Sequence, residues 1–233
     1  MTSSSDQTTL LTERFQDALR LAAEWHAPQT RKGSQVPYLS HLLGVCAVAL
    51  EFGASENEAI AALLHDALED GPANTNRAHS DLRGELVARY GDEVARLVDA
   101  ATDSVPDPDG RKPAWAERKR RYLGHLPYAP VSGLLVSASD KLYNVRTILA
   151  DLLSEGESVF GRFTAGREGT LQYYRLLSDA YRQAARERPE VARRPRLLQL
   201  FAELERTVSR LEEAAGLSSD AVRGLAPLRI TEG

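Results

Sequence analysis

Apolar residues recur at intervals of three and four along most of the chain, which is the spacing of one face of an α-helix. The segment from Leu10 to His26 shows this pattern first, and residues 38–52 and 59–69 repeat it. Further helices are expected at about 78–90, 92–102, 114–125, 131–151, 170–187 and 195–215. No segment sustains the alternation typical of a β-strand, and we find no internal repeat. The sequence therefore predicts an all-α fold, a compact multi-helix bundle.

Turn-forming residues separate the predicted helices. Residues 27–37, which read APQTRKGSQVP, and residues 103–113 both have the composition of a loop. Gly53 is expected to cap the second helix, because glycine is favoured directly after a helix end. The Gly71-Pro72 pair is expected to stop the third helix.

The remaining helix-start and loop signals suggest one main domain with an appendage. Ser55 and Glu58 have the spacing of a capping box and mark where the third helix begins. Residues 154–169 contain several glycines and are expected to be irregular, and the chain from about residue 216 is expected to be a loosely held tail. We assign residues 1–190 to the main domain and residues 191–233 to a C-terminal helical extension and tail.

Composition removes some classes of function. The 233 residues carry a net charge of -4, which argues against a nucleic-acid-binding protein that works through bulk positive charge. The one cysteine, Cys46, lies in the apolar run LLGVCAVAL, so we expect a buried residue in a reducing, cytoplasmic setting. The N-terminus lacks the features of a signal peptide, and no apolar stretch approaches the about 18 residues that span a bilayer. We expect a cytoplasmic protein that binds neither nucleic acid nor membrane.

The string AALLHDALED, residues 61–70, places an imidazole and three carboxylates after an apolar helix face. On one continuous helix, His65, Asp66, Glu69 and Asp70 would form a broad polar face at the C-terminal end. Carboxylates there oppose the helix dipole, and a bound divalent cation would reverse the sign of that interaction. The alternative is a solvated acidic helix end, and this string alone does not decide between the two.

Two further strings favour a metal site. PYLSHLLGV, residues 37–45, places His41 near the start of an apolar helix, where a histidine by itself is more often a hydrogen-bonded core residue. SASDKLYNV, residues 137–145, follows an apolar run, so the Asp140 carboxylate needs a partner such as Lys141 or a cation. Together with His65 and Asp66, these residues supply two imidazoles and two carboxylates. That set suits an octahedral metal such as Mn²⁺ or Fe²⁺ with open positions for water, and it lacks the thiolates of a structural zinc site.

The order H…HD…D, written here as LLHDALED and SASDKLYNVR, resembles the HD-domain phosphohydrolases. More narrowly, residues 10–185 resemble the (p)ppGpp hydrolase domains of RelA/SpoT-type stringent-response enzymes and their stand-alone relatives, the small alarmone hydrolases. HDALED, PYLSHLLGVCAVAL and DKLYN carry this narrower resemblance. It implies an HD-domain bundle and a metal-dependent enzyme that removes the 3′-pyrophosphate from ppGpp, pppGpp or ppApp. The product would be the nucleoside 5′-diphosphate or 5′-triphosphate.

The resemblance also implies a role for each matching residue. Glu69 and Asp70 match the acidic pair that positions and activates the attacking water, and they are the expected catalytic residues. Tyr38 matches a structural tyrosine at the pocket wall. The metal, typically Mn²⁺ in this subgroup, would be held by His41, His65, Asp66 and Asp140. The nucleotide would be contacted by Arg31, Lys32, Ser34, Lys141 and Asn144.

Several alternatives stay open on the sequence alone. The loop reads Ser-Gln-Val where the family usually has Gly-Glu or a similar pair before Pro-Tyr, so both guanine and adenine alarmones fit. A second class is an HD phosphohydrolase of another nucleotide, such as a deoxynucleoside monophosphate. A third is an antitoxin-like partner that retains the HD fold without activity. The expected partner is a small nucleotide substrate, and a homo-oligomer is compatible with the sequence.

Overall fold

The computed structural model describes residues 9–102 and 113–228, and it is built from helices. The first group of helices is α1 (Glu13–Trp25), α2 (Leu39–Glu51), α3 (Glu56–Leu64), α4 (Ala67–Thr75), α5 (His79–Tyr90) and α6 (Asp92–Ala101). The second group is α7 (Trp115–His125), α8 (Val131–Glu155), α9 (Gly166–Glu187), α10 (Pro189–Ala192), α11 (Pro195–Ala214) and α12 (Ser219–Arg223). Two 3-10 helices, η1 (Leu126–Tyr128) and η2 (Gly156–Arg162), flank α8. Within the described ranges there is no strand, so the all-α prediction is confirmed.

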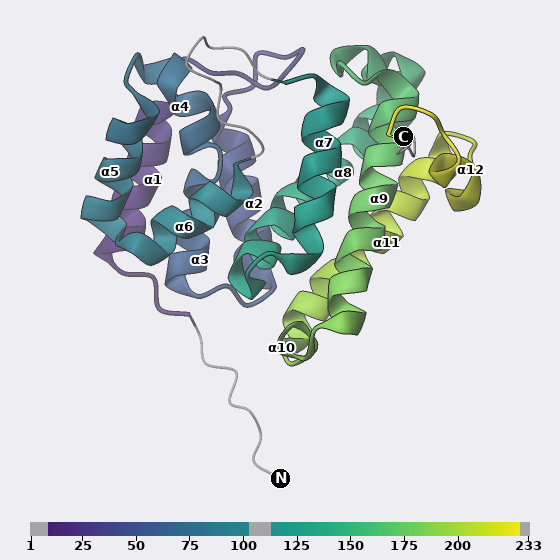
Figure 1. Cartoon of the computed structure of the whole chain (residues 1–233). Helices are drawn as coiled ribbons and strands as arrows, with labels where there is room; N and C mark the ends of the chain where they lie inside the picture. The colour runs from purple at the N-terminus through teal and green to yellow at the C-terminus, as the bar shows by residue number, and fades with distance from the viewer. Residues whose placement is uncertain (1–8, 103–112, 229–233) are drawn as a thin grey trace.

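The long helix α8 is the centre of the fold. It packs against α2, α3 and α6 of the first group and against α9 and α11 of the second. Figure 1 shows α1–α6 on one side of α7 and α8, and α9–α12 on the other. The apolar core extends through both groups, from Trp25 in α1 to Leu204 in α11. Because other helices surround α8, polar side chains on it are also buried, and Asp140 is one of them.

Gly44 lets α2 and α8 approach each other closely. A Cβ atom at position 44 would lie 1.9 Å from a ring carbon of Tyr143 on α8, so a larger residue would have to displace that ring. The centroid of the Tyr143 ring lies 5.4 Å from that of His41 on α2. This contact therefore brings His41 beside the part of α8 that carries Asp140.

Most helices begin and end close to the predicted residues. The predicted capping box is present at the start of α3: Ser55 Oγ accepts from the Glu58 amide at 3.3 Å, and Glu58 Oε2 accepts from the Ser55 amide at 2.8 Å. Gly53 follows the end of α2 with a φ of 81°, as a residue directly after a helix often does. Cys46 is buried, as expected.

The predicted continuous helix through the His-Asp pair is wrong, because the chain breaks between α3 and α4. His65 Nδ1 donates to the Ala62 carbonyl at 2.9 Å. In a regular helix the Ala62 carbonyl accepts a hydrogen bond from the backbone amide four residues later, which is that of Asp66. The His65 imidazole therefore competes with this helical hydrogen bond. The helix then restarts, with the Asp70 amide bonded to the Asp66 carbonyl at 2.9 Å. Glu69 and Asp70 therefore lie in the first turn of α4, where the helix dipole stabilises carboxylates instead of opposing them.

The Gly71-Pro72 pair does not stop this helix, in contrast to the prediction. Pro72 lies inside α4, which continues to Thr75. A proline at this position removes one backbone hydrogen bond, the one to the Leu68 carbonyl, and the helix tolerates that loss. The chain leaves the helix at Asn76, whose φ of 54° is the left-handed conformation that ends many helices.

Two later predictions also need correction. Residues 154–169 were expected to be irregular, but they contain the end of α8, all of η2 and the start of α9. The segment after residue 216 was expected to be loosely held, but it forms α12 and returns to the core. Val222 and Leu228 are buried there, and the Leu228 amide donates to Gln172 Oε1 at 2.7 Å. The predicted loop at residues 103–113 lies outside the described residues apart from its last position.

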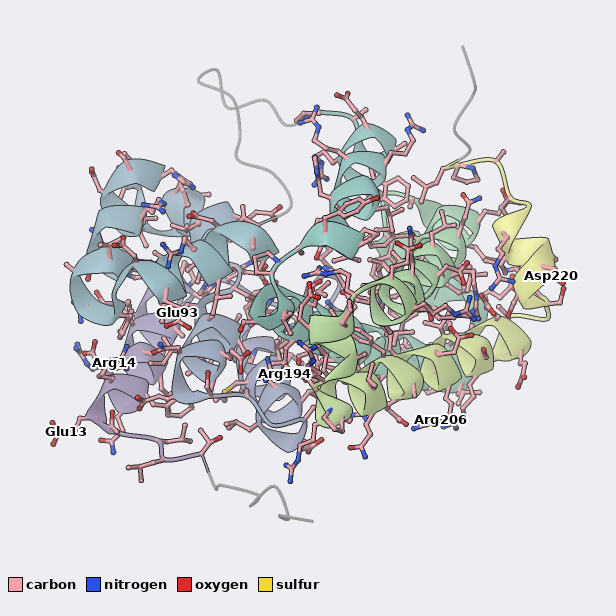
Figure 2. All side chains as sticks on the ribbon, turned by 60° about the horizontal axis from the view of Figure 1, so that its bottom comes forward. Glu13, Arg14, Glu93, Arg194, Arg206 and Asp220 are labelled. Atoms are coloured by element: carbon pink, nitrogen blue, oxygen red, sulfur yellow. The ribbon has the colours of Figure 1, made fainter. Side chains whose placement is uncertain are left out.

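Ion pairs attach the C-terminal helices to the rest of the fold. Arg194, at the start of α11, donates to Glu58 Oε1 of α3 at 2.5 Å, and it lies where the two groups of helices meet (Figure 2). Farther along, the fully buried Arg175 of α9 donates to both carboxylate oxygens of Glu212 in α11, at 2.8 and 2.6 Å. Because buried charges are stable only when paired, these contacts require α11 to stay docked.

The predicted domain boundary at residue 190 stays a prediction. In the described part of the chain, no helix has both the length and the apolar composition needed to cross a membrane.

Candidate metal and nucleotide site

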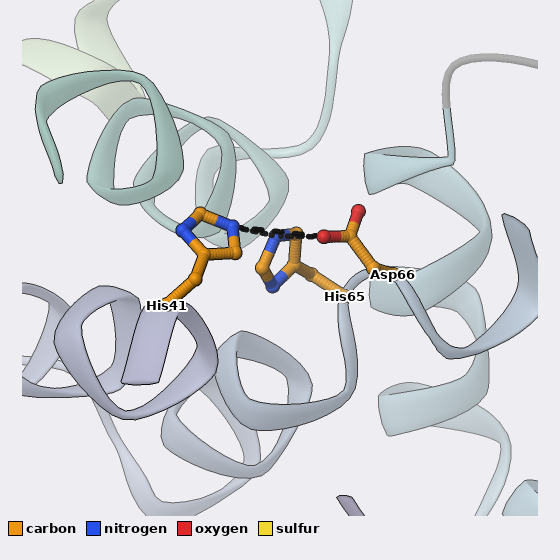
Figure 3. Close-up of side chains that lie close together, drawn as sticks. All are labelled: His41, His65 and Asp66. Carbon is orange, nitrogen blue, oxygen red and sulfur yellow. Dashed lines mark hydrogen bonds and ion pairs between the residues drawn. The ribbon is translucent and has the colours of Figure 1, made fainter. Parts of the chain in front are cut away.

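Four side chains from three parts of the chain meet between α2, α8 and the break before α4. His41 comes from the first turn of α2, His65 and Asp66 from the break, and Asp140 from the middle of α8. The Nε2 atoms of His41 and His65 are 3.2 Å apart. Asp66 Oδ2 lies 3.6 and 3.0 Å from these two nitrogens, and Asp140 Oδ1 lies 3.3 and 3.7 Å from them. Figure 3 shows His41, His65 and Asp66 turned toward one another.

These four side chains fit a divalent metal ion. Nitrogen and oxygen ligands that lie about 2.0–2.2 Å from one ion are about 3 Å from their neighbours, which is close to the separations found here. The Ala62 carbonyl can only accept, so His65 Nδ1 carries a proton and Nε2 is left to bind a cation. His41, His65 and Asp66 also form a group of potential ligand atoms within 4.8 Å of one another. Two imidazoles and two carboxylates suit Mn²⁺ or Fe²⁺.

Neighbouring residues hold both carboxylates in place. Tyr38 Oη donates to Asp66 Oδ2 at 2.5 Å. Asp140 Oδ2 accepts from Lys141 Nζ at 2.6 Å, while its Oδ1 accepts from Asn144 Nδ2 at 2.5 Å. Lys141 is therefore the partner that a buried aspartate at this position was expected to need. Because Lys141 occupies only one oxygen, the other still faces the two imidazoles.

The electrostatics of the cluster favour a positive charge. Burial acts to lower the pKa of His65, but the charges of Asp66 and Asp140 and a hydrogen bond with Asp66 raise this pKa to about 9. Burial acts to raise the pKa of Asp140, but the charge of Lys141 and the two histidines hold it well below its usual range. A proton and a metal cation therefore compete for Nε2 of His65, since only a neutral ring is a ligand.

The acidic pair lies beside the cluster on α4. Glu69 and Asp70 are half-buried in the first turn of this helix. Asp70 Oδ2 accepts from Gln29 Nε2 at 2.7 Å. Burial is the largest cause that raises the pKa of the Tyr38 hydroxyl, and the charges of Asp66, Asp70 and Asp140 raise this pKa further. All three carboxylates therefore lie close enough to Tyr38 to act on its hydroxyl.

The loop at residues 27–37 brings only part of the expected nucleotide-contacting set to the site. Arg31 Nη2 donates to Asn144 Oδ1 at 3.1 Å, and the Arg31 guanidinium lies 5.9 Å from the centroid of the Tyr38 ring. Lys32 is exposed at the surface of the loop. Ser34 Oγ instead stabilises the turn, because it donates to the Arg31 carbonyl and accepts from the Val36 amide, both at 3.2 Å.

Sequence reasoning missed three polar side chains behind the acidic pair: His26, Gln29 and Asn74. Gln29 Oε1 accepts from Asn74 Nδ2 at 2.9 Å and lies 2.6 Å from His26 Nδ1. His26 stacks on Tyr38, with 5.4 Å between the ring centroids. Residues 26–29 read HAPQ, directly before the basic loop, but nothing in that spacing indicates that Gln29 reaches α4.

Gly33 fixes the position of the loop, and its substitution should weaken substrate binding. Its φ is 72°, and a Cβ atom there would lie 3.0 Å from Arg162 Cδ, whose guanidinium is held by Asp151 at 2.8 Å. We expect Gly33→Ala to reduce the free energy of unfolding by about 1–2 kcal/mol, the cost of a left-handed alanine. It should also raise KM several-fold, because Arg31 shifts with the loop.

Thermal unfolding and steady-state kinetics measure both effects. Gly84→Ala is the matched control, because position 84 lies in α5 with open space around it. Alanine stabilises a helix interior relative to glycine, so the control should unfold no more easily than the wild type. Equal KM values for Gly33→Ala and wild type would contradict the proposed role of the loop.

Comparison with known proteins identifies the family to which the chain belongs. A family model described as HD domain matches residues 18–171, and the chain belongs to this family. It is 35% identical over 135 residues to a guanosine-3′,5′-bis(diphosphate) 3′-pyrophosphohydrolase, MESH1, of Xenopus tropicalis, covering 57% of this chain and 68% of the relative. MESH1 of Homo sapiens is 33% identical over the same shares of the two chains.

The fold is also similar to a solved structure, which is described as a metazoan ortholog of SpoT that hydrolyses ppGpp. The TM-score is 0.60 at 24% identity, and the match covers 85% of this chain and 97% of the other. The HD-domain fold and the resemblance to the RelA/SpoT-type hydrolases are thus confirmed.

Proposed function

We propose that this protein is a metal-dependent hydrolase that removes the 3′-pyrophosphate from guanosine 3′,5′-bis(diphosphate). The observation that carries the proposal is the placement of the Asp66 and Asp140 carboxylates against the imidazoles of His41 and His65, with Asp70 one helical turn after Asp66. Relatives at 33–35% identity, which the chain covers over 68% of their length, are named for this activity. The same set of residues supports an enzyme more than an inactive binding partner, since both the metal ligands and the acidic pair are present.

We assign the metal site to Mn²⁺. The mixture of two imidazoles and two carboxylates supports this choice over Mg²⁺, which prefers oxygen ligands, and over structural Zn²⁺, which prefers thiolates. When bound, such an ion supplies a positive charge that polarises a phosphoryl oxygen and lowers the pKa of nearby water. Tyr38 and Asn144 hold the two carboxylate ligands in the orientation that this role needs.

The chain itself supplies the proton acceptor. Asp70 and Glu69 are the candidates to take a proton from the attacking water. The water oxygen then bonds to the phosphorus next to the ribose, and the bond from that phosphorus to the ribose 3′-oxygen breaks. The products are a nucleoside 5′-diphosphate with a free 3′-hydroxyl and one pyrophosphate.

Basic side chains near the cluster are suited to the charged substrate. Arg31 approaches the site from the loop, and Lys141 lies beside Asp140 on α8. We assign both to charge neutralisation on the phosphates, and Lys32 to the entrance because it is exposed. Asn144 is assigned to the ribose side, although its amide also orients Asp140.

We place the protein in the cytoplasm, which the buried free Cys46 supports. A homo-oligomer stays a prediction, which light scattering can test.

A substrate panel tests the proposal. Purified protein with Mn²⁺ is given ppGpp, pppGpp, ppApp, dAMP and GTP separately, and released pyrophosphate and orthophosphate are measured. We expect pyrophosphate from the 3′-diphosphates and none from dAMP. A higher rate with ppApp than with ppGpp would move the base preference to adenine. Turnover of dAMP far above every 3′-diphosphate would identify a different HD phosphohydrolase and overturn the proposal.

A further inference from the structure

A series of hydrogen bonds runs from His26, at the end of α1, through Gln29 to Asp70 of the acidic pair. Gln29 Nε2 donates to Asp70 Oδ2 at 2.7 Å. On its other side, Gln29 Oε1 accepts from Asn74 Nδ2 at 2.9 Å and from His26 Nδ1 at 2.6 Å. His26, Gln29, Asp70 and Asn74 are therefore linked in one network.

The donors and acceptors in this series of hydrogen bonds are fixed by the carboxylate of Asp70 at its end. A carboxylate accepts hydrogen bonds and donates none, so the Gln29 amide must turn its NH₂ group toward Asp70. Its carbonyl oxygen then faces His26 and Asn74, which must both donate. Reversing the amide would place two oxygens against each other at Asp70 and two donors against each other at Asn74. The proton of His26 is consequently on Nδ1.

The residues behind Gln29 are held firmly. His26 is buried, stacks on Tyr38, and caps α1 through its amide, which donates to the Ala22 carbonyl at 3.2 Å. Burial also lowers the pKa of His26, which keeps the ring neutral. The backbone of Gln29 is fixed at both ends: its amide donates to the His26 carbonyl at 3.0 Å, and its carbonyl accepts from the Tyr38 amide at 2.9 Å. A side chain on such a support has little freedom to reorient.

We propose that Gln29 is a positioning residue for Asp70. It holds the carboxylate by Oδ2 and so presents Oδ1 to the attacking water, and His26 and Asn74 keep the Gln29 amide in the direction that this requires. The inference rests on the proposed function, because it gives Asp70 the role of proton acceptor. It adds three residues, Gln29, His26 and Asn74, that support the proposed general base.

Two substitutions of Gln29 separate shape from hydrogen bonding. Gln29→Met keeps the length of the side chain and removes both hydrogen-bonding groups. Gln29→Glu keeps acceptors for His26 and Asn74, but it places a second carboxylate against Asp70. We expect both to lower kcat about 10- to 100-fold, the range expected when a charged group loses a hydrogen bond. KM for ppGpp and the metal content should stay at wild-type values. Gln183→Met, on the surface of α9, is the matched control and should retain full activity.

A second pair of variants tests the support from His26. Asparagine can place its Nδ2 where the imidazole has Nδ1, so His26→Asn keeps the donor to Gln29 and His26→Leu removes it. We expect His26→Leu to lower kcat several-fold and His26→Asn to recover most of that loss. If both variants lose activity equally, the role assigned to His26 is wrong. Melting temperatures of all variants show which losses of rate come from unfolding.

The decisive comparison uses Asp70→Asn as a background. If Gln29 acts through Asp70, Gln29→Met should reduce kcat strongly in the wild type and hardly at all when Asp70 is already asparagine. Equal factors in the two backgrounds, or a wild-type kcat for Gln29→Met, would overturn the proposal. Nitrogen NMR of histidine-labelled protein gives a test that is independent of activity, with the His26 proton expected on Nδ1. A proton on Nε2 contradicts the chain of hydrogen bonds, whereas a wild-type protein that releases no pyrophosphate from ppGpp contradicts only the proposed function.

Discussion

His65→Ala and Asp66→Ala should each abolish both metal binding and hydrolysis. Each substitution removes one of the four proposed ligands, and the two histidine nitrogens lie 3.2 Å from each other and 3.0–3.7 Å from the carboxylate oxygens. Loss of an outer hydrogen-bonding partner typically costs about 10- to 100-fold in metal affinity. Loss of a ligand itself should cost more, and activity should fall below detection at micromolar Mn²⁺. Elemental analysis of the purified variants measures the metal, and pyrophosphate release measures the activity.

Two exposed residues provide matched controls for this experiment. His125→Ala and Asp220→Ala remove the same side chains at the surface of α7 and α12. They should contain about one metal ion per chain, as the wild type should, and keep the wild-type rate. Treatment with EDTA should inactivate the wild type, and Mn²⁺ should restore it. Full metal occupancy in both His65→Ala and Asp66→Ala would show that the ligands have been assigned wrongly.

Asp70→Asn should keep the metal and lose most of the rate. The substitution preserves the size of the side chain but removes its ability to take a proton from water. Removal of a general base typically costs about 10²–10⁴-fold. Asp70 is the stronger candidate of the acidic pair, because its carboxylate accepts a hydrogen bond from Gln29. We expect a smaller loss for Glu69→Gln. Single-turnover measurements with saturating Mn²⁺ determine the rate, and elemental analysis confirms that the metal is retained.

Asp81→Asn is the matched control for Asp70→Asn. Asp81 lies in the first turn of α5, as Asp70 does in α4, but it is exposed to solvent. Its substitution should leave the rate unchanged. A wild-type rate for Asp70→Asn would remove this residue from the reaction, and loss of metal from that variant would make Asp70 a ligand instead.

The sequence predicted the helices well because burial of one apolar face dominates each of them. The capping box at Ser55 and Glu58 and the glycine after α2 are local signals, and both are found where they were expected. The break after α3 could not be predicted in this way. It depends on His65, whose side chain hydrogen-bonds to a carbonyl of its own helix, and a pattern of apolar positions contains no such information.

The residues of the site also differ in whether local sequence signals indicate them or whether they depend on contacts between residues distant in the sequence. The strings around His41, the His-Asp pair and Asp140 indicated four metal ligands, and the structure brings these side chains together. The support from Gln29 was missed because it joins a loop to α4 across 41 positions. The anchoring of the chain after residue 216 was missed for a similar reason, since it depends on a contact of Leu228 with Gln172 in α9.

The products of ppGpp hydrolysis show directly whether this protein is a 3′-pyrophosphohydrolase. Purified protein with Mn²⁺ is incubated with ppGpp, and the products are separated by ion-exchange chromatography and examined by phosphorus NMR. We expect GDP and pyrophosphate in equal amounts, with no orthophosphate, because the 3′-diphosphate leaves as one unit. The same incubation with Asp66→Ala protein should leave ppGpp intact. Orthophosphate as the main product, or loss of the 5′-phosphates, would show that the enzyme does not release the 3′-diphosphate as pyrophosphate.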